Sequence, residues 1–230
     1  MVLLINLFLA ILIALAVTFE SFGSLFRVLG ALTNKQSIGY SMHVRVATIG
    51  RVFLIASAPM IGYLVDEGSN FKRIILICIC CYLFLSIFHI LIYINRIKII
   101  NFLLRYFCSY YNIKIIDNKI KDYELLRNRH ISLIFFSGLV FLINLSAIFV
   151  VNILAILNPN LKSTILQSIG WITMIGTSIH IFFIDPILAH NADKNDFNAM
   201  IVSDYLCGRM HGSIVGFTLS VIIYCIIKYV

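Results

Sequence analysis

Four charged residues lie inside or beside long apolar stretches in the first third of the chain: Glu20, Arg27, Arg45 and Arg51. A charged side chain at the centre of a bilayer costs about 2.5–3.5 kcal/mol on the lenient insertion scales, so such residues face a bundle interior or a water-filled cavity. The guanidinium group of arginine presents a planar fork of N–H donors that matches phosphate oxygens. These residue types therefore indicate recognition of an anionic group inside a membrane protein.

Two further charges, Asp204 and Arg209, lie in the last apolar stretch, so that arginines outnumber carboxylates within the apolar segments. This excess predicts a cationic cavity that binds an anionic lipid headgroup. We expect Arg51, the deepest of the arginines, to contact the ligand, and internal pairing with a carboxylate is the alternative. Arg209 either contacts the ligand or is neutralised by Glu20 and Asp204 in a structural network. Arg45 lies nearer the end of its segment and can extend to the membrane surface.

The composition places these residues in a membrane protein. The chain is 61% hydrophobic and 12% charged, with a mean hydropathy of +0.99, which is far from the values of a soluble domain. Its 230 residues accommodate about six spans of roughly 20 residues each and one longer loop. We therefore predict an all-α fold, a polytopic helical bundle that forms a single membrane domain over residues 1–230.

Apolar stretches and helix breakers set the expected boundaries. The spans are expected at about residues 2–22, 39–63, 74–95, 131–157, 164–184 and 198–227. Pro59 is expected to kink the second span, because proline removes a backbone hydrogen bond. The fifth span is expected to end before Pro186, since the residue before a proline is biased away from helix. Gly208, Gly212 and Gly216 recur every four residues in the sixth span, a small-residue stripe typical of close helix packing.

Residues 96–130 are the one long segment between spans, and they carry eight Lys or Arg. Within them Ile113, Ile116, Ile120 and Tyr123 recur at helical spacing, which predicts an amphipathic helix on the membrane surface. Its basic charge fits anionic lipid headgroups better than nucleic acid. The loops after the first, third and fifth spans carry eleven Lys or Arg against four on the other side. We therefore expect these loops in the cytoplasm and both termini outside.

No enzyme or cofactor motif is present. The sequence has no nucleotide-binding P-loop, no His-Glu-x2-His zinc motif and no carboxylate-rich magnesium motif. We therefore predict no catalytic residue, no metal site and no cofactor. Without an ATP motif, net movement of a ligand would be driven by an ion gradient, by the membrane potential or by consumption of the ligand on the far side.

Two blocks of residues resemble a known family. The first block reads Glu20-x6-Arg27-x2-Gly30, followed by Arg51-x7-Pro59-x2-Gly62-x3-Asp66. The second block consists of Asp185-Pro186 and Arg209-x2-Gly212-Ser213. In both blocks the chain resembles the Amj family of bacterial lipid II flippases.

This resemblance implies a multi-pass protein of the bacterial cytoplasmic (inner) membrane. Such a protein moves lipid II, the undecaprenyl-pyrophosphate-linked precursor of peptidoglycan, from the cytoplasmic to the outer leaflet. The candidates for pyrophosphate binding are Arg51, Arg209, Arg45 and Arg27, and the expected charge network is Glu20, Asp204 and Asp185. The expected partners are the polyprenyl-pyrophosphate lipid and anionic membrane lipids, and a homo-oligomer or cell-wall synthesis proteins are open as further partners.

Three alternatives stay open. Instead of a lipid II flippase, the protein is in these alternatives a flippase for another polyprenyl-linked saccharide, a membrane enzyme that acts on lipid phosphates, or a scaffold within a cell-wall complex. In the enzyme, Glu20 or Asp204 would act as base and the arginines would hold the phosphate. Thin-layer analysis of a labelled lipid separates the first two, because a flippase leaves the lipid chemically unchanged.

Overall fold

A computed structural model of the chain describes residues 2–67, 70–112, 130–193 and 199–229, and these residues are helical without any strand. The long helices are α1 (Val2–Leu32), α2 (Gln36–Asp66), α3 (Phe71–Ile94), α4 (Arg96–Tyr111), α5 (Ile131–Leu157) and α9 (Ala199–Tyr229). Between α5 and α9 lie the shorter elements η3 (Pro159–Leu161), α6 (Lys162–Gln167), α7 (Ile169–Ile179), η4 (His180–Ile184) and α8 (Asp185–Asp193).

Within the described residues, six helical segments are long and apolar enough to cross a membrane. They cover Leu4–Leu32, Gln36–Asp66, Phe71–Ile94, Ile131–Leu157, Pro159–His190 and Ile201–Lys228. The all-helical class and the number of long apolar segments are therefore confirmed, and they are the features of a multi-pass membrane protein.

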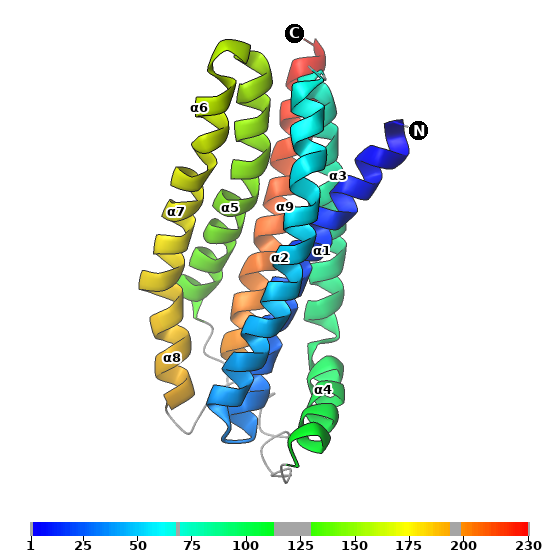
Figure 1. Cartoon of the computed structure of the whole chain (residues 1–230). Coiled ribbons are helices and arrows are strands. Elements are labelled where there is room, and N and C mark those ends of the chain that lie inside the picture. Colours follow the sequence, from blue (N-terminus) through cyan, green and yellow to red (C-terminus); the bar gives the residue numbers. More distant parts are fainter. Residues whose placement is uncertain (1, 68–69, 113–129, 194–198, 230) are drawn as a thin grey trace.

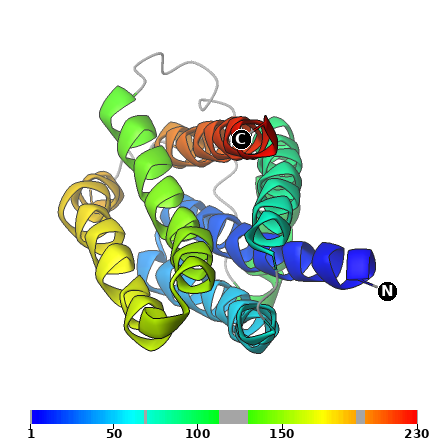
Figure 2. The same ribbon diagram turned by 90° about the horizontal axis from the view of Figure 1, so that it is seen from above.

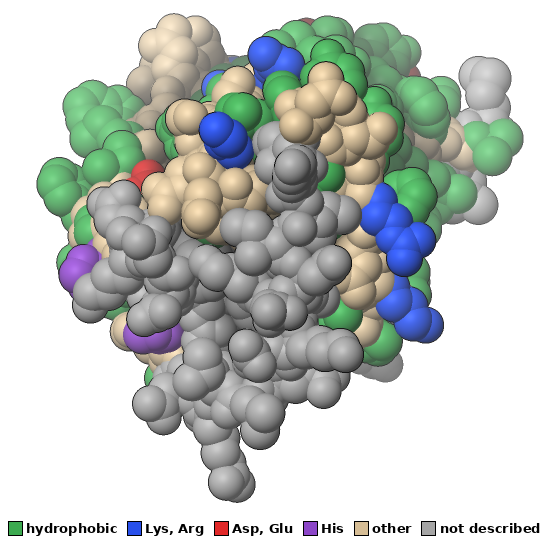
Figure 3. All heavy atoms as spheres, turned by 90° about the horizontal axis from the view of Figure 1, so that it is seen from below, with side chains coloured by type: hydrophobic (Ala, Val, Ile, Leu, Met, Phe, Trp, Pro, Cys, Tyr) green, Lys and Arg blue, Asp and Glu red, His purple; other side chains and the backbone are tan. Residues whose placement is uncertain are grey.

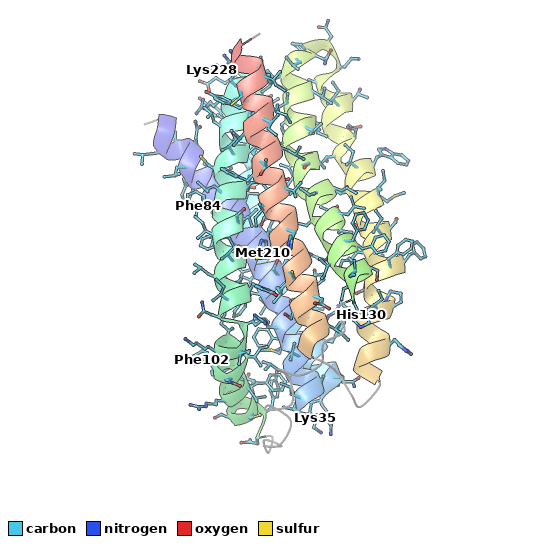
Figure 4. All side chains as sticks on the ribbon, turned by 180° about the vertical axis from the view of Figure 1, so that it is seen from behind. Lys35, Phe84, Phe102, His130, Met210 and Lys228 are labelled. Carbon is cyan, nitrogen blue, oxygen red and sulfur yellow. The ribbon has the colours of Figure 1, made fainter. Side chains whose placement is uncertain are left out.

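The segments run up and down in one bundle (Figure 1). The α1–α2 turn, α4 and the end of α8 lie toward one end, and the α5–α6 turn and the C-terminus lie at the other. Lys35 and Lys228 mark these opposite ends (Figure 4). Seen from above, α9 lies between α3 and α5, and the segment from α6 to α8 flanks α5 on the outside (Figure 2).

Close packing of α1 on α2 depends on glycine. A Cβ atom on Gly39 would lie 2.6 Å from the Cα atom of Gly30 and 2.6 Å from the carbonyl oxygen of Phe26. Only a residue without a side chain allows the two backbones to approach so closely. Two other close approaches, of Gly23 to His43 and of Gly50 to Ala16, fix the antiparallel register of the two helices.

The glycine stripe of α9 lies against two helices. A Cβ atom on Gly212 would lie 2.8 Å from the carbonyl oxygen of Gly138 in α5. Gly208 lies against Ser137 of the same helix, and Gly216 lies against the ring of Tyr82 in α3. The stripe therefore allows α9 to pack between α3 and α5.

Two helix ends differ from the prediction. The first helix continues ten residues beyond the expected end at residue 22, to Leu32, so Arg27 is helical. The prediction that the fifth span ends before Pro186 was wrong, because α8 begins at Asp185 and continues through Pro186. The π-helical turn η4 precedes α8 and places Pro186 in the first turn of a new helical segment, where a backbone N–H is not needed. The second helix runs through Pro59 to Asp66.

The basic segment after α3 is described in part. It begins with α4, whose residues Leu103, Leu104 and Phe107 are buried against α1 and α9. The predicted amphipathic stretch from Ile113 to Tyr123 lies outside the described residues. The helix α4 therefore shows how this segment is anchored to the bundle.

Candidate functional site

A cavity of about 720 Å³ lies between α1 and α2 on one side and α5 and α7 on the other, and it reaches α9. Its carboxylate, arginine and histidine lining residues are Glu20, Arg27, His43, Arg51, His180 and Arg209. Apolar side chains such as Leu54 and Ile55 line the rest. An amphipathic ligand with an anionic group would find both kinds of surface here.

Arg209 is the most deeply buried of these charges, and it is paired. Its Nη2 atom donates to Oε1 of Glu20 over 2.7 Å, and its Nη1 atom lies 3.4 Å from Oγ of Ser21. The guanidinium group also lies 5.0 Å from the ring centre of Tyr205. The side chain of Arg209 is 4% exposed, whereas that of Glu20 is 49% exposed. Arg209 is thus held on three sides, as in a structural ion pair.

A buried histidine extends this network. Nε2 of His89 lies 2.9 Å from Oγ of Ser21, which also contacts Arg209. The ring of His89 packs edge-on against Phe141 at 5.4 Å. The third span thus contributes to the polar interior as well as to packing.

Arg27 forms a looser pair. Its Nη1 atom lies 3.4 Å from Oδ1 of Asp185, while Nδ1 of His180 lies 3.4 Å from Oδ2 of the same carboxylate. The guanidinium group lies 5.1 Å from the ring centre of Tyr40, and its Nε atom is buried without a hydrogen-bond partner. His180 opens the π-helical turn η4 and Asp185 follows it, so this turn places both residues beside α1; such turns are frequent at functional sites.

Arg51 is exposed and lines the cavity. Within the described part of the chain, no carboxylate lies within ion-pair distance of its guanidinium group. An arginine without a counter-ion among apolar helices is costly. The free guanidinium group is therefore the feature of the cavity that most clearly needs an anion.

Arg27 and Arg51 lie at different depths along the bundle. The approaches of Gly23 to His43 and of Gly50 to Ala16 place Arg51 level with the first half of α1. Arg27 lies near the α1–α2 turn. The offset is about twelve residues, or about 18 Å of helix axis at 1.5 Å per residue. The cavity thus has one cation near the end of the bundle and one toward its middle.

Two predicted site residues lie elsewhere. Arg45 is exposed and does not line the cavity, because it lies two residues, or about 200° of rotation, from the lining residues His43 and Ala47. Asp204 is buried but does not neutralise Arg209, since its Oδ2 atom accepts the backbone N–H of His130 over 2.9 Å. His130 precedes α5 (Figure 4), and a carboxylate is favourable at the positive end of a helix dipole.

Sequence reasoning missed several polar lining residues, among them His43, His180 and Asn144. Nδ1 of His43 and Oδ1 of Asn144 are buried without a hydrogen-bond partner, and both residues line the cavity. One signal was available for His43, which lies eight residues before Arg51 and thus about 80° from it around the helix, within one broad helical face. No comparable signal existed for Asn144 in its uncharged helix.

Comparisons with protein-family models, with curated proteins and with solved structures found no match to this chain. The resemblance to the Amj family therefore stays a prediction that depends on the two blocks of motif residues. Function has to be inferred from the cavity and from the helices that build it.

Proposed function

We propose that this protein is a flippase that moves a lipid with a phosphate or pyrophosphate headgroup across a membrane. The observation that carries the proposal is Arg51, whose guanidinium group lines a cavity among six apolar segments and has no counter-ion within the described residues. A phosphate would supply the missing anion through charge-assisted hydrogen bonds. Arg27 adds a second cation nearer the end of the bundle.

The apolar part of the cavity supports a lipid rather than a soluble anion. Leu54 and Ile55 lie on the same face of α2 as Arg51, and Ile55 is 70% exposed. A headgroup can therefore bind Arg51 while its tail lies along apolar side chains that face the bilayer.

A polyprenyl-pyrophosphate lipid is the specific candidate, and the resemblance to Amj favours lipid II. In this proposal the lipid moves from the cytoplasmic to the outer leaflet of the bacterial inner membrane. The charge distribution supports the orientation, because Lys35 in the α1–α2 turn and the basic helix α4, with Arg96, Lys98 and Arg105, lie at the same end of the bundle (Figures 1 and 4). Lys and Arg side chains reach the surface at that end (Figure 3).

The direct test is transport in vesicles. The purified protein is reconstituted with a fluorescent polyprenyl-pyrophosphate lipid, and its appearance in the outer leaflet is followed by dithionite quenching. We expect transport by the wild type and by Arg45→Gln, a matched control on the same helix outside the cavity, and loss of transport in Arg51→Gln. Equal transport by the two variants would refute the assignment of Arg51.

The same vesicles separate the flippase from an enzyme and from a scaffold. A flippase returns the lipid unchanged on thin-layer analysis, whereas a membrane enzyme converts it. A scaffold moves no lipid. In cells, the wild type but not Arg51→Gln should restore growth after depletion of the resident lipid II flippase.

A further inference from the structure

Two ion pairs of different strength involve arginines that line the cavity. Arg209 and Glu20 are joined over 2.7 Å, and the Arg209 side chain is 4% exposed. Arg27 and Asp185 are joined over 3.4 Å, with side chains that are 18% and 41% exposed. The pair with the longer contact and the more exposed guanidinium group is the weaker one. Arg27 is thus the paired arginine that can most readily change its partner.

We propose that Asp185 is a placeholder for the anion of the ligand. It pairs with Arg27 in the empty cavity and releases Arg27 to the phosphate when the lipid binds. This inference rests on the proposed function, since it assigns Arg27 to the same anionic headgroup. Asp185 is a positioning residue in this scheme, because it acts on the ligand through Arg27.

Asp185 can release Arg27 without becoming an isolated buried charge. Its second oxygen, Oδ2, lies 3.4 Å from Nδ1 of His180, which stays beside it because both residues belong to one continuous helical stretch. The carboxylate is also 41% exposed, so water can replace the guanidinium group. The large penalty for stranding a charge, which applies to fully buried pairs, is therefore avoided.

Arg27 is equally suited to change partner. Its Nε atom is buried without a hydrogen-bond partner, so the guanidinium fork is only partly used. The ring of Tyr40 supports the guanidinium group at 5.1 Å, and this cation–π contact does not depend on which anion is bound. A phosphate could use donors that Asp185 leaves free.

Competition between Asp185 and the phosphate for Arg27 keeps the affinity of the cavity for the lipid low enough for release. A transport site must bind its ligand well enough to load but weakly enough to unload. Because the phosphate must displace Asp185, part of its binding energy is spent on breaking the Arg27–Asp185 pair. Removal of the Asp185 charge should therefore strengthen binding and slow transport.

The test measures binding to the full-length protein in nanodiscs. The probe is geranylgeranyl diphosphate, with inorganic pyrophosphate in a parallel series. We expect Asp185→Asn to bind the lipid probe about tenfold more tightly, because loss of one competing charge-assisted contact is of that order, and to transport more slowly. The gain should vanish in the double variant Arg27→Gln/Asp185→Asn. Asp66→Asn, whose carboxylate pairs with Lys162 outside the cavity, should bind like the wild type.

Each outcome has a separate meaning. Equal or weaker binding by Asp185→Asn, together with loss of binding in Arg51→Gln, would refute the placeholder role and leave the proposed function intact. No binding of either probe by the wild type would refute both. Equal affinity for inorganic pyrophosphate would assign the site to a soluble diphosphate compound and refute the flippase. The exchange at Arg27 would then stand only if Asp185→Asn also bound inorganic pyrophosphate more tightly. Asp185→Ser replaces Asp185→Asn if the latter does not give a folded protein.

Discussion

The three arginines that line the cavity differ in what surrounds each guanidinium group. Arg209 has a carboxylate, a hydroxyl and an aromatic ring around it, Arg27 has an exposed carboxylate, and Arg51 has no carboxylate partner among the described residues. The loss of stability when an arginine is removed depends on whether a buried partner group is left unpaired. The three residues should therefore respond differently to substitution.

Replacement of Arg51 should impair transport without unfolding the protein. Arg51→Ala leaves no carboxylate stranded and removes a charge that is costly to hold, so the thermal stability in detergent should stay level or rise. Bound phosphate loses a charge-assisted contact worth about 1.5–3 kcal/mol, and Arg51→Lys should fail in part because a point charge replaces the fork. Thermal unfolding and transport are measured together. A marked loss of stability in Arg51→Ala would indicate a structural role instead.

Replacement of Glu20 should have the opposite pattern. Glu20→Gln leaves the buried guanidinium group of Arg209 without its counter-ion, which should cost about 3 kcal/mol of stability. Neutralising both partners in Glu20→Gln/Arg209→Met should recover much of the loss, because no charge is then stranded. Thermal unfolding of the single and double variants checks this, and additive losses would contradict the pairing.

The sequence predicted that each long helix exists, and its approximate length, better than it predicted where the helix ends and how it is rotated about its axis. Runs of apolar residues long enough to cross a bilayer identify the six segments. The continuation of α1 past residue 22 and the π-helical turn before Pro186 were missed, because both depend on packing against neighbouring helices rather than on local preference. The pairing of Asp204 was missed for a related reason, since the rotation of α9 directs its carboxylate to the start of α5.

The contact between α9 and α5 offers a test of packing. Gly212→Leu should lower the free energy of unfolding by about 1–3 kcal/mol, because its side chain would collide with the backbone of Gly138. The matched control is Gly62→Leu, since a Cβ atom at Gly62 meets nothing within 4 Å. Thermal unfolding in detergent compares the two. Equal stability would show that α9 and α5 do not pack as described.

The molecule as a whole combines a firmly packed side with a loosely closed one. The helix α9 packs on both α3 and α5, whereas α2 packs chiefly on α1. At the far end α2 is joined to α6 by the exposed ion pair between Asp66 and Lys162. The cavity lies on this less tightly packed side, where Arg51, Leu54 and Ile55 line it. A lipid would meet both the cation and the apolar wall there, which fits lateral loading from a bilayer.

The orientation of the bundle can be tested independently of its ligand. A cysteine is introduced either at Lys35, in the α1–α2 turn, or at Asn160, in the α5–α6 turn, after Cys225→Ser has removed an exposed native thiol. The positive-inside distribution predicts that Lys35 lies in the cytoplasm. An impermeant maleimide should therefore label the Asn160 variant in intact spheroplasts and the Lys35 variant only after the membrane is opened. Burial raises the pKa of the Cys108 thiol, so this native cysteine should react slowly. The reverse labelling pattern would invert the bundle and place the Arg27 end of the cavity outside, which would reverse the proposed direction of loading.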